Sequence, residues 1–98
     1  AYPREQMVFA AVLLPCLVDD EDYSAVDETL LKLEECYEVD WCEFDIAEAA
    51  VRAARMLTEL REQERSMRAF GIAAHQYKNL GLDDAHARTL EEMSANHE

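Results

Sequence analysis

Apolar residues follow a helical period through most of the chain. Every position from Met7 to Leu14 is apolar, and Pro3 stands four residues before this run. Proline is favoured in the first turn of a helix, where its missing N–H would have no intrahelical partner. The pattern predicts a helix from about residue 4 to residue 14 or 18, with Pro15 as the point at which it kinks or ends.

A second apolar stripe begins after the acidic run DDED at 19–22. Carboxylates stabilise the positive end of the helix dipole, so this run suits a helix start. Apolar residues then recur at alternating steps of three and four, which predicts one face of a helix that begins between residues 20 and 25 and ends at 37. The stripe consists of Tyr23, Val26, Leu30, Leu33 and Tyr37.

A third stripe follows a pattern typical of a helix start. Asp45 and Glu48 are spaced as in a capping box, and Phe44 precedes them in the position of a hydrophobic staple. The helical phase continues through the polar segment TELREQERSMR, so we expect one long central helix. Gly71 is the point at which this helix would bend or break. The stripe consists of Ile46, Ala50, Ala53, Leu57, Leu60 and Met67.

The last part of the chain predicts a shorter helix. Gly81 suits the position just after a helix C-terminus, and a final helix over about 84–95 should turn Leu90 and Met93 inward. The sequence therefore predicts an all-α fold, a small four- to five-helix domain with one long central helix. Residues 1–98 form a single domain in this interpretation, because 98 residues suffice for one core and not for two.

Two features predict a homodimer. The first helix lacks a polar face, and the long helix exceeds what the other helices can cover. A symmetric partner would bury both surfaces.

The charge is distributed unevenly along the chain. The formal net charge is −13, and residues 19–48 hold 13 acids and one base. Such a surface disfavours direct binding to nucleic acid and to anionic membranes. Residues 52–68 hold five arginines and three acids. We therefore expect the acidic block to be a solvated face or to meet arginines, either on the long helix or on a partner.

No pattern for a metal site, cofactor or catalytic centre is present. Five residues separate Cys36 from Cys42, unlike the close pairs of structural zinc sites, and His75, His86 and His97 are scattered. Carboxylates around the two thiols disfavour the thiolate, so we interpret these cysteines as small apolar residues. The sequence predicts a non-enzymatic protein without a cofactor.

The location of the protein is predicted from its thiols and from its first apolar run. Three cysteines is an odd number, which favours free thiols in a reducing compartment, the cytoplasm. The run at 7–18 is too short to span a bilayer and lacks the basic start of a signal peptide.

By elimination, the sequence favours a regulatory protein that binds another protein. We expect an anti-activator or inhibitor that blocks the dimerisation or DNA binding of a transcription factor. The alternatives are an acidic nucleic-acid mimic that occupies a basic groove, and a structural subunit of a larger assembly. The predicted contact residues are Val8, Phe9, Val12, Leu13, Tyr37, Trp41 and Phe44.

Overall fold

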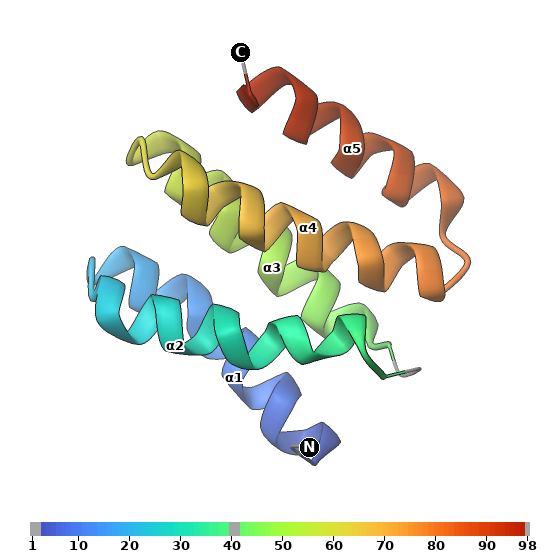
Figure 1. The fold of residues 1–98 in the computed structure, drawn as a ribbon, viewed down its shortest axis with the longest axis horizontal. Helices are drawn as coiled ribbons and strands as arrows, with labels where there is room; N and C mark the ends of the chain where they lie inside the picture. Colours follow the sequence, from blue (N-terminus) through green and yellow to red (C-terminus); the bar gives the residue numbers. More distant parts are fainter. Residues whose placement is uncertain (1–2, 40–41, 98) are drawn as a thin grey trace.

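The computed structural model describes residues 3–39 and 42–97, which are almost entirely helical (Figure 1). The elements are α1 (Arg4–Asp19), α2 (Tyr23–Leu33), the 3₁₀ helix η1 (Glu34–Tyr37), α3 (Phe44–Glu59), α4 (Gln63–Asn79) and α5 (Asp83–His97). These residues contain no β-strand, which confirms the all-α prediction. No helix in the described ranges has both the length and the apolar character needed to cross a membrane.

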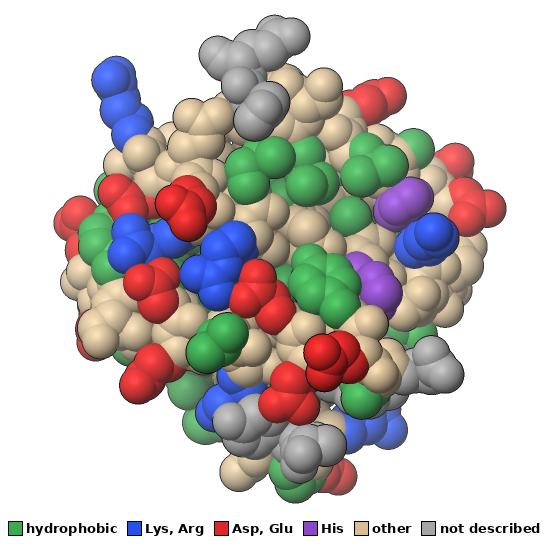
Figure 2. All heavy atoms as spheres, viewed as in Figure 1, with side chains coloured by type: hydrophobic (Ala, Val, Ile, Leu, Met, Phe, Trp, Pro, Cys, Tyr) green, Lys and Arg blue, Asp and Glu red, His purple; other side chains and the backbone are tan. Residues whose placement is uncertain are grey.

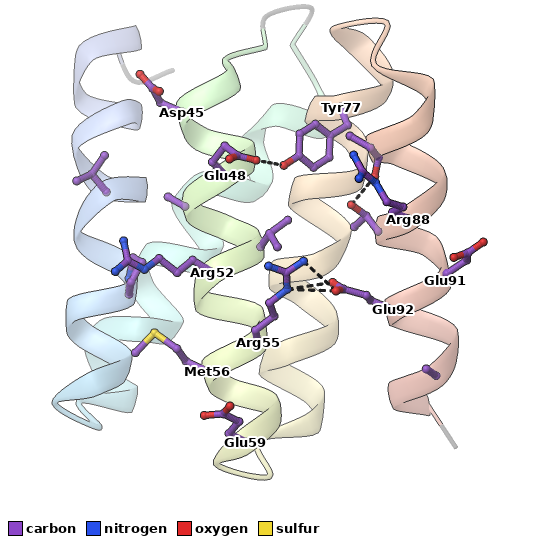
Figure 3. A pocket seen from close by; sticks show the side chains of 17 residues that line it. Asp45, Glu48, Arg52, Arg55, Met56, Glu59, Tyr77, Arg88, Glu91 and Glu92 are labelled. Carbon is purple, nitrogen blue, oxygen red and sulfur yellow. Dashed lines mark hydrogen bonds and ion pairs between the residues drawn. The ribbon is translucent and has the colours of Figure 1, made fainter.

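Helix α3 occupies the centre of the fold. It packs against α1 on one side and α4 on the other, while α5 packs against α4 and α2 packs against α1. Figure 3 shows α1, α3 and α5 side by side in front of α2 and α4. Small side chains on α3 let α1 and α4 approach it closely. The buried residues of α3 are Ile46, Ala47, Ala50, Val51, Ala53, Ala54 and Leu57.

The predicted long central helix is divided into two, which corrects the sequence-based expectation. The chain turns at residues 60–62, where Arg61 takes a left-handed conformation with φ 62°. The N–H of Arg61 donates to the carbonyl of Thr58 at 3.0 Å, and that of Glu62 donates to Leu57 at 2.9 Å. These two bonds close the helix end by the Schellman pattern, which usually has glycine at the left-handed residue. Because arginine and not glycine occupies this position, no local sequence pattern predicted the break.

Gly71, where the break was expected, lies inside α4. A Cβ at this position would lie 2.9 Å from the Tyr37 hydroxyl oxygen. The glycine therefore allows a side chain from η1 to approach the α4 backbone. Its role in the fold is close packing and not helix termination.

The α1–α2 and α3–α4 hairpins bury equivalent positions. Glu21 in the α1–α2 turn and Gly81 in the α4–α5 turn take left-handed conformations, and both turns form the same pair of hydrogen bonds as the turn at Arg61. The buried positions of α2 and η1 also recur forty residues later in α4. These pairs are Val26 and Ser66, Leu30 and Phe70, Leu33 and Ala73, and Cys36 and Gln76.

Pro15 does not end the first helix, which continues to Asp19. Leu14 and Val18, on either side of the proline, are both fully buried. Packing on α2 and α3 therefore holds α1 together across the missing backbone hydrogen bond.

Helix α5 packs differently from the prediction. Leu90 is 45% exposed, Met93 is partly buried, and the most buried side chain is Thr89 at 4% exposure. The inward placement predicted for Leu90 is therefore wrong. The reason is that α5 contacts mainly α4, so only a narrow side of the helix is covered.

Candidate protein-binding surface

One side of α1 presents apolar side chains to solvent. Phe9 is 65% exposed, Val12 54% and Leu13 40%, and Cys16 is exposed on the same side. We call these four residues the α1 ridge. Residues 6–18 include no charged side chain. Exposed apolar residues that adjoin one another are more often interaction sites than scattered ones are.

The other predicted contact residues do not join this ridge. Val8 is partly buried and packs against the core. Tyr37 and Phe44 are half exposed and lie in η1 and at the start of α3. Trp41 lies outside the described residues.

Tyr37 and Phe44 each have an aromatic neighbour within the chain. The Tyr37 ring meets His75 edge-on with ring centroids 4.9 Å apart, and Phe44 meets Tyr77 edge-on at 6.4 Å. Burial raises the pKa of the Tyr37 hydroxyl to about 12. Both side chains therefore contribute to packing around α4 and also keep an exposed edge.

A groove opens beside the α1 ridge. Its volume is about 1010 Å³, and α3 contributes the largest share of its lining. Val12 and Pro15 of α1 line one side and α5 lines the other, with Tyr77 of α4 behind (Figure 3). Val12 belongs to both the ridge and the groove, so the two surfaces are continuous.

The groove contains two arginines that pair with no carboxylate of the described residues. Arg55 pairs with Glu92 across the groove, with Nη2 and Oε1 2.9 Å apart. Arg52 and Arg88 also line the groove and form no ion pair or hydrogen bond with the described residues. Both side chains are exposed. Acidic residues share the lining: Figure 3 shows Asp45 at one end, Glu59 at the other and Glu91 at the outer edge.

Tyr77 forms part of the groove wall. Its hydroxyl donates a hydrogen bond to Glu48, and burial together with this carboxylate raises the Tyr77 pKa to about 12. The interaction leaves Glu48 less free to pair with an arginine. The hydroxyl stays protonated at neutral pH and fixes the position of the Glu48 carboxylate.

The contact between α2 and α4 uses arginine in a different way. Arg65 donates from Nε and Nη2 to the two oxygens of Asp27 at 2.8 and 2.9 Å. Arg68 donates to Glu34 at 2.7 Å. Figure 2 shows basic and acidic side chains intermingled on this side of the molecule. Part of the acidic block thus meets arginines of its own chain, one of the two arrangements that the charge pattern predicted.

The three thiols have different surroundings. Cys36 is buried, and burial raises its pKa, with the neighbouring Gln76 side chain partly opposing the shift. Gln76 is itself buried and accepts a hydrogen bond from the Glu43 N–H at 2.7 Å, so it connects α4 to the segment before α3. Cys16 is exposed, and no disulfide joins the cysteines. Within residues 3–39 and 42–97, no three His, Cys, Asp or Glu side chains are grouped as metal ligands.

The chain matches no protein-family model, no curated protein and no solved structure.

The groove was not predicted from the sequence. Its components are spread over α1, α3, α4 and α5, and the expectation of one continuous central helix would have separated Arg55 from Glu92. The polar spacing of Glu48, Arg52, Arg55 and Glu59 along α3 marks a solvent-facing stripe. That spacing does not reveal that α5 would lie opposite it.

Proposed function

We propose that this protein is a non-enzymatic regulator that works as a homodimer and binds another protein in the groove between α1, α3 and α5. The observation that carries the proposal is that Arg52 and Arg88 form no ion pair with residues 3–39 and 42–97, in a groove of about 1010 Å³ that adjoins exposed apolar residues. In a chain with 22 acids and nine bases, most arginines can find a carboxylate. Among the described residues three arginines, Arg52, Arg61 and Arg88, form no ion pair, and two of these, Arg52 and Arg88, lie in one groove, where they are available to a partner.

The dimensions and lining of the groove favour a protein segment as ligand. Grooves between helices bind amphipathic helices through apolar anchor residues. Val12, Ala49 and Met56 supply apolar contacts here, and the arginines would pair with carboxylates of the bound helix. Acids at both ends of the groove favour basic residues at the ends of that helix.

In its narrower form, the proposal names the partner as a transcription factor whose dimerisation or DNA binding is blocked. The support is the acidic surface, which repels DNA and attracts the basic regions of DNA-binding proteins. The proposal places this regulator in the cytoplasm, where three free thiols are stable.

Affinity capture from a lysate of the source organism tests the proposal when variants are compared. Wild-type protein should retain one stoichiometric partner at about 150 mM salt, and Arg52→Glu should lose it. Lys78→Glu is the matched control, because Lys78 is an exposed base on α4 outside the groove lining and the change in net charge is the same. Equal capture by both variants would contradict binding in the groove.

The narrower form has its own test. Purified partner should lose specific DNA binding in a gel mobility assay when the protein is added, and Arg52→Glu should leave DNA binding intact. A partner that does not bind DNA, or whose DNA binding is unchanged, would exclude the anti-activator.

A nucleic-acid mimic is the second candidate function. Asp19, Asp20, Glu21 and Asp22 are all exposed in the turn between α1 and α2, and such a cluster could imitate phosphates in a basic groove. Mimicry predicts partners that are lost between about 150 and 500 mM salt, because salt screens contacts between exposed charges. Capture that depends on the 19–22 turn and not on Arg52 would favour the mimic.

A further inference from the structure

We infer that the α1 ridge is the docking site for a second copy of this chain, with the two α1 helices packed antiparallel. The inference rests on the homodimer of the proposed function and goes further by naming its surface and orientation. The partner groove shares Val12 with the ridge, but its arginines lie on α3 and α5 and not on α1. Each dimer would therefore present two grooves.

The ridge lies on an uncharged part of a strongly acidic molecule. Two molecules of net charge −13 repel each other wherever acidic surfaces meet. Residues 6–18 offer a stretch of α1 without charge, and the ridge lies on its outer side, opposite the buried side of the helix. The buried side consists of Met7, Ala11, Leu14 and Val18. Along this ridge a second copy can approach without bringing acidic side chains together.

The acids at the two ends of α1 determine the relative orientation of the two helices. Four acids at 19–22 follow the ridge at the C-terminal end of α1, while at the other end Arg4 is paired with Glu43 and Glu5 adds one acid. Parallel packing would place two clusters of four acids side by side. Antiparallel packing separates them by about 24 Å, the length of a 16-residue helix. Each cluster then lies beside the positive dipole end of the partner helix.

The ridge covers about two helical turns, from Phe9 to Cys16, so the contact is modest in area. Stable interfaces bury about 800 Å² per partner. We therefore expect neighbouring residues of α1 to join the contact, and we expect the dimer to dissociate reversibly. The dimer should also tighten as salt rises, because salt screens the repulsion between two acidic molecules while apolar contacts persist.

Sedimentation equilibrium of the purified protein tests the surface. Wild type should form dimers, and Phe9→Glu and Leu13→Glu should each raise the dimer dissociation constant by at least about tenfold, since a carboxylate would be buried in an apolar contact. The matched control is Leu31→Glu, because Leu31 is 69% exposed on α2, away from the ridge. Circular dichroism confirms that each variant remains folded. A monomeric wild type, or a Leu13→Glu dimer as tight as wild type, would overturn the inference.

Disulfide formation tests the orientation. Antiparallel packing centred between Val12 and Leu13 places residue 9 of one copy opposite Cys16 of the other, so Phe9→Cys should form an interchain disulfide between positions 9 and 16 under mild oxidation. The two Cys16 side chains would be offset by about 10 Å along the helix, so wild type should not cross-link through them. A Cys16–Cys16 disulfide in wild type would overturn the antiparallel arrangement.

These results are separable from those of the partner experiment. A monomeric wild type that still captures a partner through Arg52 would contradict the dimer and leave the groove proposal in place. A dimer that captures no partner would do the opposite.

Discussion

The α2–α4 contact and the groove between α3 and α5 contain the same residue types in opposite states. At the α2–α4 contact, the Arg65 and Arg68 side chains are 28% exposed, and each bonds to a carboxylate of α2 or η1. In the groove, Arg55 is 63% exposed and pairs across the gap, while Arg52 and Arg88 have no such partner in the part of the chain that the structure describes. An arginine forms an internal ion pair where a helix with carboxylates packs directly beside it. It remains available to a binding partner where the neighbouring helix lies farther away.

This difference explains how an acidic protein can have a binding surface that is not its acidic surface. Some of the densest acidic sequence lies on α2 and η1, where Asp27 and Glu34 are paired within the chain. Charge counts along the sequence point to residues 19–48 as the place of interaction. The packing of the helices instead indicates that the binding surface lies on the opposite layer of the molecule, which contains the groove.

The largest expected effect is a loss of folding stability at the α2–α4 contact. Leu30 is fully buried on α2, so Leu30→Ala should lower the free energy of unfolding by about 2–5 kcal/mol. Val12 lines the open groove and is 54% exposed, so Val12→Ala should change it by less than about 0.5 kcal/mol. Urea denaturation measures both. Similar losses for the two variants would mean that the groove is part of the core.

The next effect compares the arginines themselves. Arg68→Ala should cost about 1 kcal/mol, because it removes a partly buried charge pair with Glu34. Arg52→Ala should be neutral within about 0.5 kcal/mol, since no internal bond is lost. A double-mutant cycle between Arg68 and Glu34 isolates the pair energy. A coupling energy of zero would show that the ion pair between Arg68 and Glu34 stabilises the fold no more than the unpaired groove arginines do.

The pH dependence of folding stability should reflect the ion pairs at the α2–α4 contact. The hydrogen bonds from Arg65 hold the pKa of Asp27 below its ordinary value of 3.8. The ionised carboxylate therefore stabilises the fold above about pH 4, and this contribution is lost as the pH falls through the lower folded pKa. Asp27→Asn should be less stable than wild type at pH 7, and the difference should shrink below pH 4. A difference that stays constant down to pH 3 would contradict the pairing.

The smallest effect concerns the groove wall. Tyr77 has a pKa of about 12 because it is buried and donates to Glu48. Its neutral form is favoured in the folded protein, so its contribution to stability is present below pH 10 and is lost as the pH rises towards 12. Glu48→Gln should lower the Tyr77 pKa, which ultraviolet titration detects when compared with Tyr77→Phe. An unchanged titration would show that Glu48 does not contact the hydroxyl in solution.

Helical periodicity was sufficient to predict the fold class and insufficient to place one turn. The stripes of α2 and α3 correspond to buried residues such as Val26, Leu30 and Leu57, because a helix buries what its period places on one side. The turn at Arg61 was missed because a non-glycine residue adopts the left-handed conformation there. Gly71 was misread because its reason is a contact with Tyr37, which lies 34 positions earlier in the chain.

Of the candidate binding surface, only the part on α1 was predicted from the sequence. The apolar run from Met7 to Leu14 indicated a helix that neighbours could not cover completely, and Phe9, Val12 and Leu13 are exposed accordingly. Arg52 and Arg88 could not be selected from nine basic residues, because their availability depends on which carboxylates pack beside them. That information belongs to the tertiary structure, and no local sequence pattern indicates it.

Hydrogen–deuterium exchange on the complex with the captured partner tests the central claim most directly. If the partner occupies the groove, backbone amides of α3 and α5 should exchange more slowly in the complex than in the free protein, while those of α2 should be unchanged. Protection confined to α2 and the 19–22 turn would contradict the claim, because it would place the partner on the acidic side of the molecule.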